Sequence, residues 1–306
     1  MHQIDTKRSD IILVSYPPGG FGNFVYHCVS CFSSDTVKIN SQFQFSASGH
    51  SHQSCKYIQV FGLVELDYEA WITVKDVDIN QRIVILSDHT FARPDPGYVD
   101  TRKVFPNATI VRLCVDEDSK YVIFQTMQAK AKNLDFKREF SDRLSQRLGR
   151  PATQSEQRQA WLVDFNFHEN DHRPNQHNFA NGIRAWHPVH EPGVINISVC
   201  DLIDDPVMCL SDLIHTLGMQ VVNLQDLQAL CAQWKQVNSE YFRAYSKWHE
   251  MEQALQNGTN IVLDDIQCAF DQAYLLFRLR QNYGHRISDE FEWFRDMDQM
   301  REMIHE

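Results

Sequence analysis

Short apolar runs alternate along this chain with segments in which apolar residues recur every three or four positions. The runs are rich in Ile, Val and Leu and predict buried β-strands. They cover residues 11–14, 57–64, 82–86, 109–115 and 194–199. Strands that alternate with helices predict an α/β fold, with a mainly parallel sheet flanked by helices on both faces.

The helical segments are indicated by apolar periodicity and by residues that begin or end helices. They cover residues 23–29, 120–132, 133–160, 206–217 and 224–243, with at least two more patterns after residue 261. Asp205 and Pro206 suit a helix start, and Gly218 suits a helix end. Residues 161–192 are rich in aromatic residues and histidine with little periodicity, and predict a long irregular segment.

The chain length of 306 residues is sufficient for one large domain or two small ones, with a proper core. The strands and most helices fall between about residues 10 and 245. We therefore predict a single α/β domain over residues 1–306, with a C-terminal helical extension over about residues 246–306.

Composition narrows the classes of partner. The chain is 43% hydrophobic and 23% charged, as in ordinary soluble proteins, and its net charge is −11. This charge argues against binding to nucleic acid or to an anionic membrane. No apolar run approaches the length of a membrane span, and residues 1–10 are too polar for a signal peptide. We predict a cytoplasmic protein, and a homo-oligomer is compatible with the sequence.

Cysteine and histidine are numerous but lack the spacing of metal ligands. Eight cysteines in a chain of this length do not indicate a disulfide scaffold. Cys28 and Cys31 form a C-x-x-C without a second ligand pair, so we predict that they pack in the core. The 14 histidines include no H-E-x-x-H or similar motif. No metal site is therefore expected.

A turn rich in glycine and proline follows the first strand and precedes the first helix. It contains Pro17, Pro18, Gly19, Gly20 and Gly22. Glycines let backbone N–H groups approach a ligand, and a helix start favours negative charge, so this turn predicts a phosphate site. No Gly-Lys-Ser/Thr follows, which disfavours a standard ATP or GTP P-loop. A tight connection without a ligand is the alternative.

Polar residues in or after two other strands also indicate a site for an anionic ligand. Asp88 and His89 follow a buried strand, where open α/β sheets place ligands. Arg112 lies inside another strand, and a buried arginine is costly unless it meets an anion. An ion pair with Asp116 or Glu117 would satisfy Arg112 equally well.

The order of these segments resembles the sulfotransferases that use 3′-phosphoadenosine 5′-phosphosulfate (PAPS). Ser15-Tyr16-Pro17 and the glycine turn are similar to the family's S-Y-P-K-S-G-T-T loop, and Leu86 to His89 to its K-T-H strand end. Phe105 to Arg112 resembles the stretch before the family's 3′-phosphate arginine. Residues 195–218 resemble its strand, "DL…DP" turn and "LG" helix end. Pro18 stands where the family has its loop lysine.

The resemblance implies a P-loop-like sulfotransferase fold and transfer of a sulfuryl group from PAPS to a small-molecule or carbohydrate acceptor, with 3′-phosphoadenosine 5′-phosphate (PAP) as product. His89 would be the catalytic base, because imidazole titrates near neutral pH, and Asp88 would orient it. Arg112 and Ser119 would hold the 3′-phosphate. The 5′-phosphosulfate would lie against the turn, which consists of Pro17, Pro18, Gly19, Gly20, Phe21, Gly22 and Asn23.

Two other functions fit parts of the sequence. Gly19 to Phe24 also resembles the G-G-L-G-N-Q opening of fucosyltransferases that use GDP-fucose. A non-catalytic protein that binds a nucleotide or a partner is the third interpretation, and Pro18 favours it because the loop lysine is missing.

Overall fold

The computed structural model describes most of the predicted strands and helices. The described residues are 7–17, 20–37, 59–61, 71–73, 81–86, 105–116, 118–120, 122–123, 126, 136–170, 186–257 and 268–283. The chain divides into two compact units, Met1–Ile123 with Ile183–Ser239 and Phe124–Gly182 with Glu240–Glu306. This division differs from the predicted single domain with an extension from residue 246, because the second unit also takes residues from the middle of the chain.

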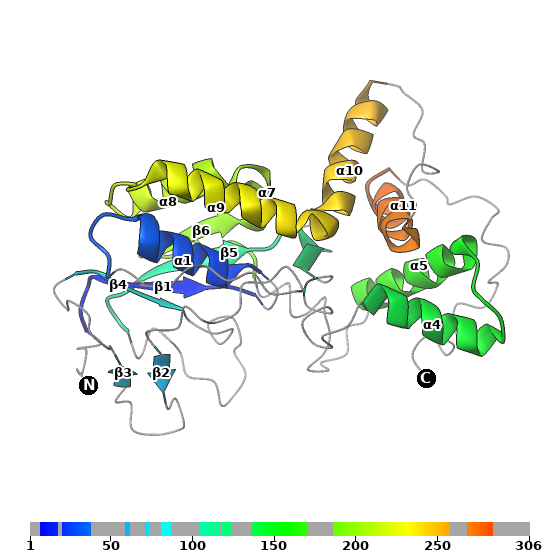
Figure 1. Cartoon of the computed structure of the whole chain (residues 1–306), viewed down its shortest axis with the longest axis horizontal. Coiled ribbons are helices and arrows are strands. Elements are labelled where there is room, and N and C mark those ends of the chain that lie inside the picture. The colour runs from blue at the N-terminus through cyan, green and yellow to red at the C-terminus, as the bar shows by residue number, and fades with distance from the viewer. Residues whose placement is uncertain are drawn as a thin grey trace. The chain divides into compact units, whose positions relative to one another are not determined.

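The first unit is built on a parallel sheet of four strands (Figure 1). The strand order is β4-β1-β5-β6, and each neighbouring pair is parallel. The strands are β1 (Ile11–Ser15), β4 (Ile83–Leu86), β5 (Thr109–Cys114) and β6 (Val194–Ser198). Every residue of β1 is buried, as expected for a continuous apolar strand in the middle of a sheet. The predicted α/β class with a parallel sheet is confirmed.

The strand predicted at residues 57–64 is shorter in the structure and belongs elsewhere. It forms β2 (Gln59–Phe61), which pairs antiparallel with β3 (Trp71–Thr73) in a separate two-stranded sheet. Its sequence pattern indicated a strand correctly, but pattern alone does not select the pairing partner.

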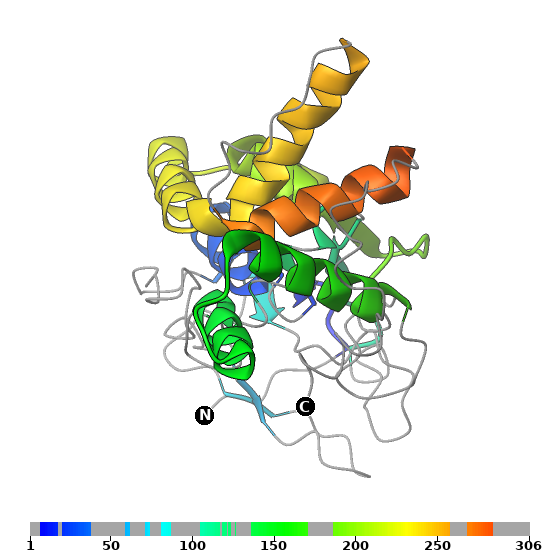
Figure 2. The ribbon, with the colours of Figure 1, turned by 90° about the vertical axis from the view of Figure 1, so that its right-hand side faces the viewer.

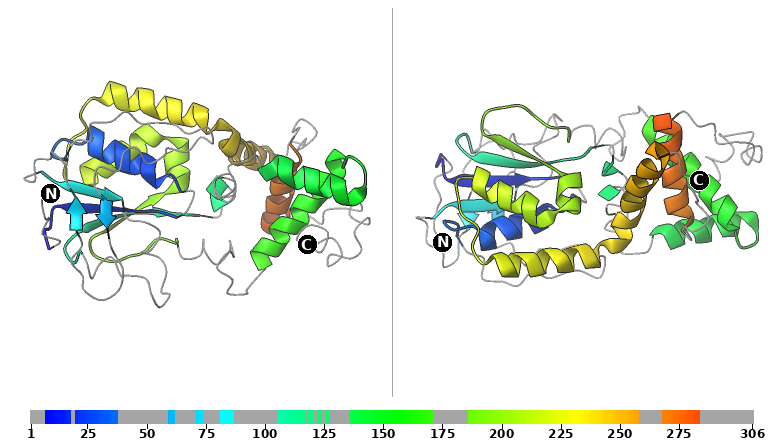
Figure 3. Two further views of the ribbon diagram at one scale, coloured as in Figure 1. Left: turned by 60° about the horizontal axis from the view of Figure 1, so that its bottom comes forward. Right: turned by 90° about the horizontal axis from the view of Figure 1, so that it is seen from above.

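Helices of the first unit cover one side of the parallel sheet. They include α1 (Gly22–Phe32), α8 (Pro206–Thr216) and α9 (Leu224–Val237). Helix α1 packs against β1 and β4, and α8 packs against α1 and α9. Figures 1 and 3 show these three helices on the same side of the sheet. The predicted helical cover is confirmed for this face.

Local sequence explains how the helices after β6 begin. Ser198 ends β6 and caps α7 (Val199–Asp204) by accepting hydrogen bonds from the N–H groups of Cys200 and Asp201. Val199 therefore belongs to a helix rather than to the predicted strand. Asp205 caps α8 as predicted, and Gly218 follows its end with φ 71°.

The second unit is helical in its described part. It contains α4 (Phe136–Leu148), α5 (Gln154–Asn170), α11 (Ala269–Tyr283) and, from Glu240 on, α10 (Ser239–Gln256). Helix α11 lies beside α5, in orange and green in Figure 2. The irregular segment predicted at residues 161–192 is wrong over residues 161–170, which belong to α5. In this helix Trp161 stacks on Phe140 and meets the edge of Phe270.

The single helix predicted at residues 224–243 is also wrong, because two helices meet at Asn238. The Asn238 side chain donates a hydrogen bond of 2.8 Å to the Trp234 carbonyl, and its backbone N–H donates to the same oxygen. Asparagine competes for backbone carbonyls in this way and so interrupts helices. The predicted helix from Lys120 does begin there, with the Lys120 N–H donating to the Asp116 carbonyl.

Candidate functional site

The strand order identifies the sheet edge where a ligand is expected. Strand β1 lies between β4 and β5, so the chain moves from β1 to one neighbour and later crosses to the other. In open α/β sheets, ligands bind outside the carboxyl ends of the two strands at such a reversal. The turn from Pro17 to Asn23 follows β1 here, and Asp116 to Ser119 follow β5.

The turn after β1 brings a left-handed residue directly to the start of α1. The Gly20 N–H donates to the Pro17 carbonyl at 2.8 Å. Phe21 then has φ 61° and ψ 18°, the left-handed region, and stands at the N-cap of α1. A left-handed residue followed by helical residues turns successive N–H groups toward one side, which is the backbone geometry of anion-binding nests.

The start of α1 is also buried and has no side-chain cap. A phenylalanine side chain has no acceptor, so Phe21 cannot cap the first turn as Ser, Thr, Asp or Asn would. Gly22 is buried and Phe21 is only 6% exposed. The N–H groups of Phe24 and Val25 donate to the Phe21 carbonyl at 2.9 and 3.2 Å. The start of a helix also favours a negatively charged ligand.

The two glycines that the structure describes here are needed for close packing. A Cβ on Gly22 would lie 2.0 Å from Cγ of Tyr16, and one on Gly20 would lie 2.5 Å from Cγ of Pro17. Neither distance is compatible with a side chain. The glycines therefore serve the tight connection itself, which is the alternative to a phosphate site.

Ser15, the last residue of β1, carries a buried hydroxyl. Ser15 is 1% exposed, and its Oγ has no hydrogen-bond partner among the described residues. Buried polar groups are normally satisfied by protein, water or ligand. Ser15 is in register with Arg112 of β5, so both side chains lie on the same face of the sheet.

Arg112 is buried in β5 and contacts the segment of residues 186–189. It is 2% exposed, its Nε donates to the His187 carbonyl at 3.2 Å, and its guanidinium lies 4.9 Å from the centre of the Trp186 ring. Burial lowers the pKa of Arg112, although an arginine remains charged at neutral pH. The segment is held in place by Val189, whose N–H and carbonyl both bond to the Asn196 side chain.

Asp116 is the centre of a hydrogen-bond network after β5. Its Oδ1 accepts from the Ser119 hydroxyl at 2.8 Å, the Ser119 N–H at 2.9 Å and Cys200 Sγ at 2.8 Å, and its Oδ2 accepts from the Ser198 hydroxyl at 2.7 Å. Burial alone would raise the pKa of Asp116, but the bonds from Cys200, Ser198 and Ser119 outweigh it and lower that pKa. This carboxylate joins the ends of β5 and β6.

The structure brings together part of the predicted site. Pro17, Gly20, Phe21, Gly22 and Asn23 form the turn and the start of α1, and Arg112 lies on the neighbouring strand. The predicted ligand residues Pro18 and Gly19 and the predicted catalytic residues Asp88 and His89 lie outside the described residues.

Ser119 and Arg112 have contacts that sequence reasoning did not foresee. The Ser119 hydroxyl, predicted to meet a phosphate, donates to Asp116. Arg112 contacts the Trp186 ring and the His187 carbonyl, and the charge of Glu191 also acts on it. Asp116, considered as its ion-pair partner, accepts hydrogen bonds from Ser119, Ser198 and Cys200. Glu117 lies outside the described residues.

Three residues important to this edge were missed at the sequence level, namely Trp186, Ser198 and Trp234. Trp234 stands at an apolar position of a helical pattern, which indicated burial but no partner. Its ring stacks on Phe24 at 4.4 Å and 3° and meets the edge of Phe21 at 5.2 Å and 88°. No sequence signal could have paired residues more than 200 positions apart.

The described residues also allow three other features to be compared with the sequence, namely metal ligands, cysteines and membrane-spanning helices. They contain no group of three or more His, Cys, Asp or Glu side chains that could hold a metal ion. Cys28 is fully buried, as predicted, whereas Cys31 is only half-buried, and its Sγ lies 3.9 Å from Nδ1 of His27. Among these residues no helix has the length and apolar content to cross a membrane.

Comparisons with protein-family models, curated proteins and solved structures find no match for this chain.

Proposed function

We propose that this chain binds the phosphates of a nucleotide at the carboxyl ends of β1 and β5, and that it is a divergent PAPS-dependent sulfotransferase. The observation that carries the proposal is the start of α1, which is buried, lacks a side-chain cap and follows the left-handed Phe21 at the reversal of strand order. The sulfuryl chemistry comes from the resemblance of the sequence motifs.

The residues present fit the phosphate part of this ligand better than the rest. In the proposal, the backbone at the start of α1 binds the 5′-phosphosulfate, and Arg112 supplies positive charge from β5. Ser15 adds a buried hydroxyl on the same face as Arg112. Pro18 has no charge and cannot replace the family's loop lysine. In the proposal, Arg112 therefore supplies more of the positive charge that the phosphates require.

PAPS supplies an activated sulfuryl group when it is bound. His89 is proposed to take the proton from the acceptor hydroxyl or amine, and Asp88 to orient the His89 ring. Excluding water and aligning the acceptor are the remaining tasks of the protein in such a transfer.

A non-catalytic nucleotide-binding protein is the second candidate. Two observations favour it. The Ser119 hydroxyl donates to Asp116 instead of pointing to a ligand, and Pro18 removes the loop lysine. In this candidate the same edge binds a nucleotide without moving a sulfuryl group.

The test is ligand binding by the full chain, measured by thermal shift and isothermal titration calorimetry with PAP, GDP and inorganic sulfate. Binding of PAP but not GDP supports the proposal, since a ligand at 100 times its Kd stabilises by about 2.7 kcal/mol. Binding of GDP alone supports the GDP-fucose type of glycosyltransferase. Binding of none of the three rejects a phosphate site at this edge.

Two variants separate binding from catalysis. Arg112→Ala should weaken PAP binding by about 1.5–3 kcal/mol, the usual contribution of a charge-assisted contact. His89→Ala should abolish sulfate transfer and leave PAP binding nearly intact. PAP binding without any transfer from PAPS by the wild type, across a panel of hydroxyl and amine acceptors, supports the non-catalytic candidate.

A further inference from the structure

The aromatic side chain of Trp234 contacts the N-cap residue of α1 and a residue of its first turn. Its ring meets the edge of Phe21, the left-handed N-cap residue, and stacks on Phe24 in the first turn. Trp234 is 1% exposed and belongs to α9, far along the chain from the turn. Figures 1 and 3 show α1 and α9 on the same side of the sheet.

We propose that Trp234 is a positioning residue for anion binding, because it holds Phe21 in the left-handed conformation and so keeps the first-turn N–H groups of α1 turned toward one side. This inference rests on the proposed function in one respect, since it assumes that the anion binds at the start of α1. The clamp is defined as Phe21, Phe24 and Trp234.

The conformation of Phe21 requires such a contact. A bulky residue does not favour the left-handed region, whereas asparagine tolerates it. Among the residues that the structure describes, the other non-glycine residue with positive φ is Asn223, which is exposed and has the tolerant side chain. Phe21 lacks that tolerance, so its conformation must come from its surroundings, and its ring is buried against Trp234.

The end of α9 fixes the position of Trp234 in turn. The Asn238 side chain donates to the Trp234 carbonyl at 2.8 Å, and the neighbouring Lys235 Nζ donates to the Asp204 carbonyl at 2.9 Å. The clamp thus joins the turn after β1 to a helix anchored at its own carboxyl end. By linkage, an anion that favours the arrangement at α1 must also favour the packing of Trp234.

The experiment uses the full chain with Trp234→Phe, and with Trp248→Phe as the matched control. Trp248 is equally buried at 0% exposed but belongs to α10 in the second unit, so its variant reports the general effect of losing a buried indole. Hydrogen–deuterium exchange is measured over residues 17–25, and Kd is measured for PAP and for inorganic sulfate.

Trp234→Phe should speed exchange over residues 17–25 at least fivefold and raise the Kd for PAP at least tenfold. Trp248→Phe should change both by less than twofold at a similar loss of Tm. The double variant Phe21→Asn with Trp234→Phe should recover at least part of the affinity, because asparagine holds the left-handed conformation without the ring contact. A merely structural role of Trp234 would not produce that recovery.

Three outcomes overturn the inference. Exchange over residues 17–25 in Trp234→Phe within twofold of wild type shows that Trp234 does not hold the turn. Equal effects of the two tryptophan variants on Kd show only general destabilisation, and no recovery in the double variant rejects the role of the Phe21 conformation. If the wild type binds neither PAP nor sulfate, the proposed function fails first, and exchange alone decides whether Trp234 holds the start of α1.

Discussion

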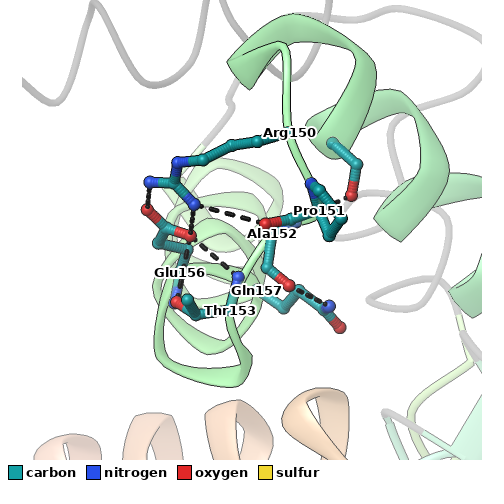
Figure 4. Close-up of polar contacts among 7 residues, drawn as sticks. Arg150, Pro151, Ala152, Thr153, Glu156 and Gln157 are labelled. Atoms are coloured by element: carbon teal, nitrogen blue, oxygen red, sulfur yellow. Dashed lines mark hydrogen bonds and ion pairs between the residues drawn. The ribbon is translucent and has the colours of Figure 1, made fainter.

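Helices α1 and α5 begin in opposite ways. At α5, the Thr153 hydroxyl accepts from the Glu156 N–H, and the Glu156 carboxylate accepts from both the N–H and the hydroxyl of Thr153 (Figure 4). This is a capping box, and Arg150 adds a bidentate pair to Glu156. At α1, a buried phenylalanine stands in the capping position.

The difference separates a helix start that has a side-chain cap from one that has none. The cap of α5 holds its carboxylate firmly, and the Arg150 pair together with the Thr153 bonds lowers the pKa of Glu156 to about 2. The start of α1 has a left-handed residue that costs about 1–2 kcal/mol and no side-chain acceptor in return. Sites that keep such strain are often functional sites, which is consistent with the proposed anion site.

The largest expected effect comes from the glycine that begins α1. Gly22→Ala places a Cβ 2.0 Å from the Tyr16 ring, and Tyr16 is itself 8% exposed and cannot move aside easily. Overpacking of this kind typically destabilises by about 1–3 kcal/mol, and we expect about 3 kcal/mol here with loss of PAP binding. Urea unfolding and calorimetry measure the two effects.

Gly149→Ala is the matched control, near the start of α5. Gly149 has φ 67°, but a Cβ there would meet nothing within 4 Å. The expected cost is therefore conformational only, about 1–2 kcal/mol, with no change in PAP binding. If Gly22→Ala and Gly149→Ala lower the free energy of unfolding by the same amount, the close approach of Gly22 to the Tyr16 ring is contradicted.

The second effect is a pH dependence of the free energy of unfolding, which originates in His27 of α1. Burial lowers the pKa of His27 from 6.5 to about 4. Between these values the unfolded chain binds a proton that the folded chain does not, so stability should fall by about 3 kcal/mol as the pH drops from 6.5 to 4. The free energy of unfolding, measured across this range, should lose that slope in His27→Gln.

His215→Gln is the control for the histidine variant, because His215 is exposed in the last turn of α8. It should leave the free energy of unfolding at neutral pH within about 0.5 kcal/mol of the wild-type value, as most surface substitutions do. A slope that persists in His27→Gln would contradict the burial of a neutral imidazole in α1.

The smallest effect is expected from the cap of α5. Glu156→Gln removes the carboxylate that accepts from Thr153 and Arg150, and losing a cap costs about 0.5–2 kcal/mol. Arg150 is half exposed, so its charge adds little beyond the cap. In the wild type this stabilisation is lost as the pH falls from 4.5 toward 2, because the folded carboxyl keeps its charge longer than the unfolded one.

Unfolding by urea between pH 5 and pH 2 checks this prediction. The difference in stability between wild type and Glu156→Gln should shrink toward the acid end. PAP binding at neutral pH should be unaffected, and a loss of binding would contradict the separation between the start of α5 and the ligand site.

The amino-acid pattern was sufficient for the features that depend on neighbouring residues. The apolar run at residues 11–14 predicted β1, and Asp205, Pro206 and Gly218 predicted the bounds of α8. Capping and strand burial depend on side chains a few positions apart, so the sequence determines them locally. The glycine turn was predicted for the same reason.

Tertiary structure alone decided which distant residues meet. Trp161 packs against Phe140 and Phe270, and the Trp186 ring lies against Arg112, for which the sequence suggested a phosphate or an ion pair with Asp116 or Glu117. The contact of Trp234 with Phe21 likewise needed the folded chain. Packing between segments depends on the whole fold, because a hydrophobic side chain gains free energy from any apolar partner and its sequence does not specify which one.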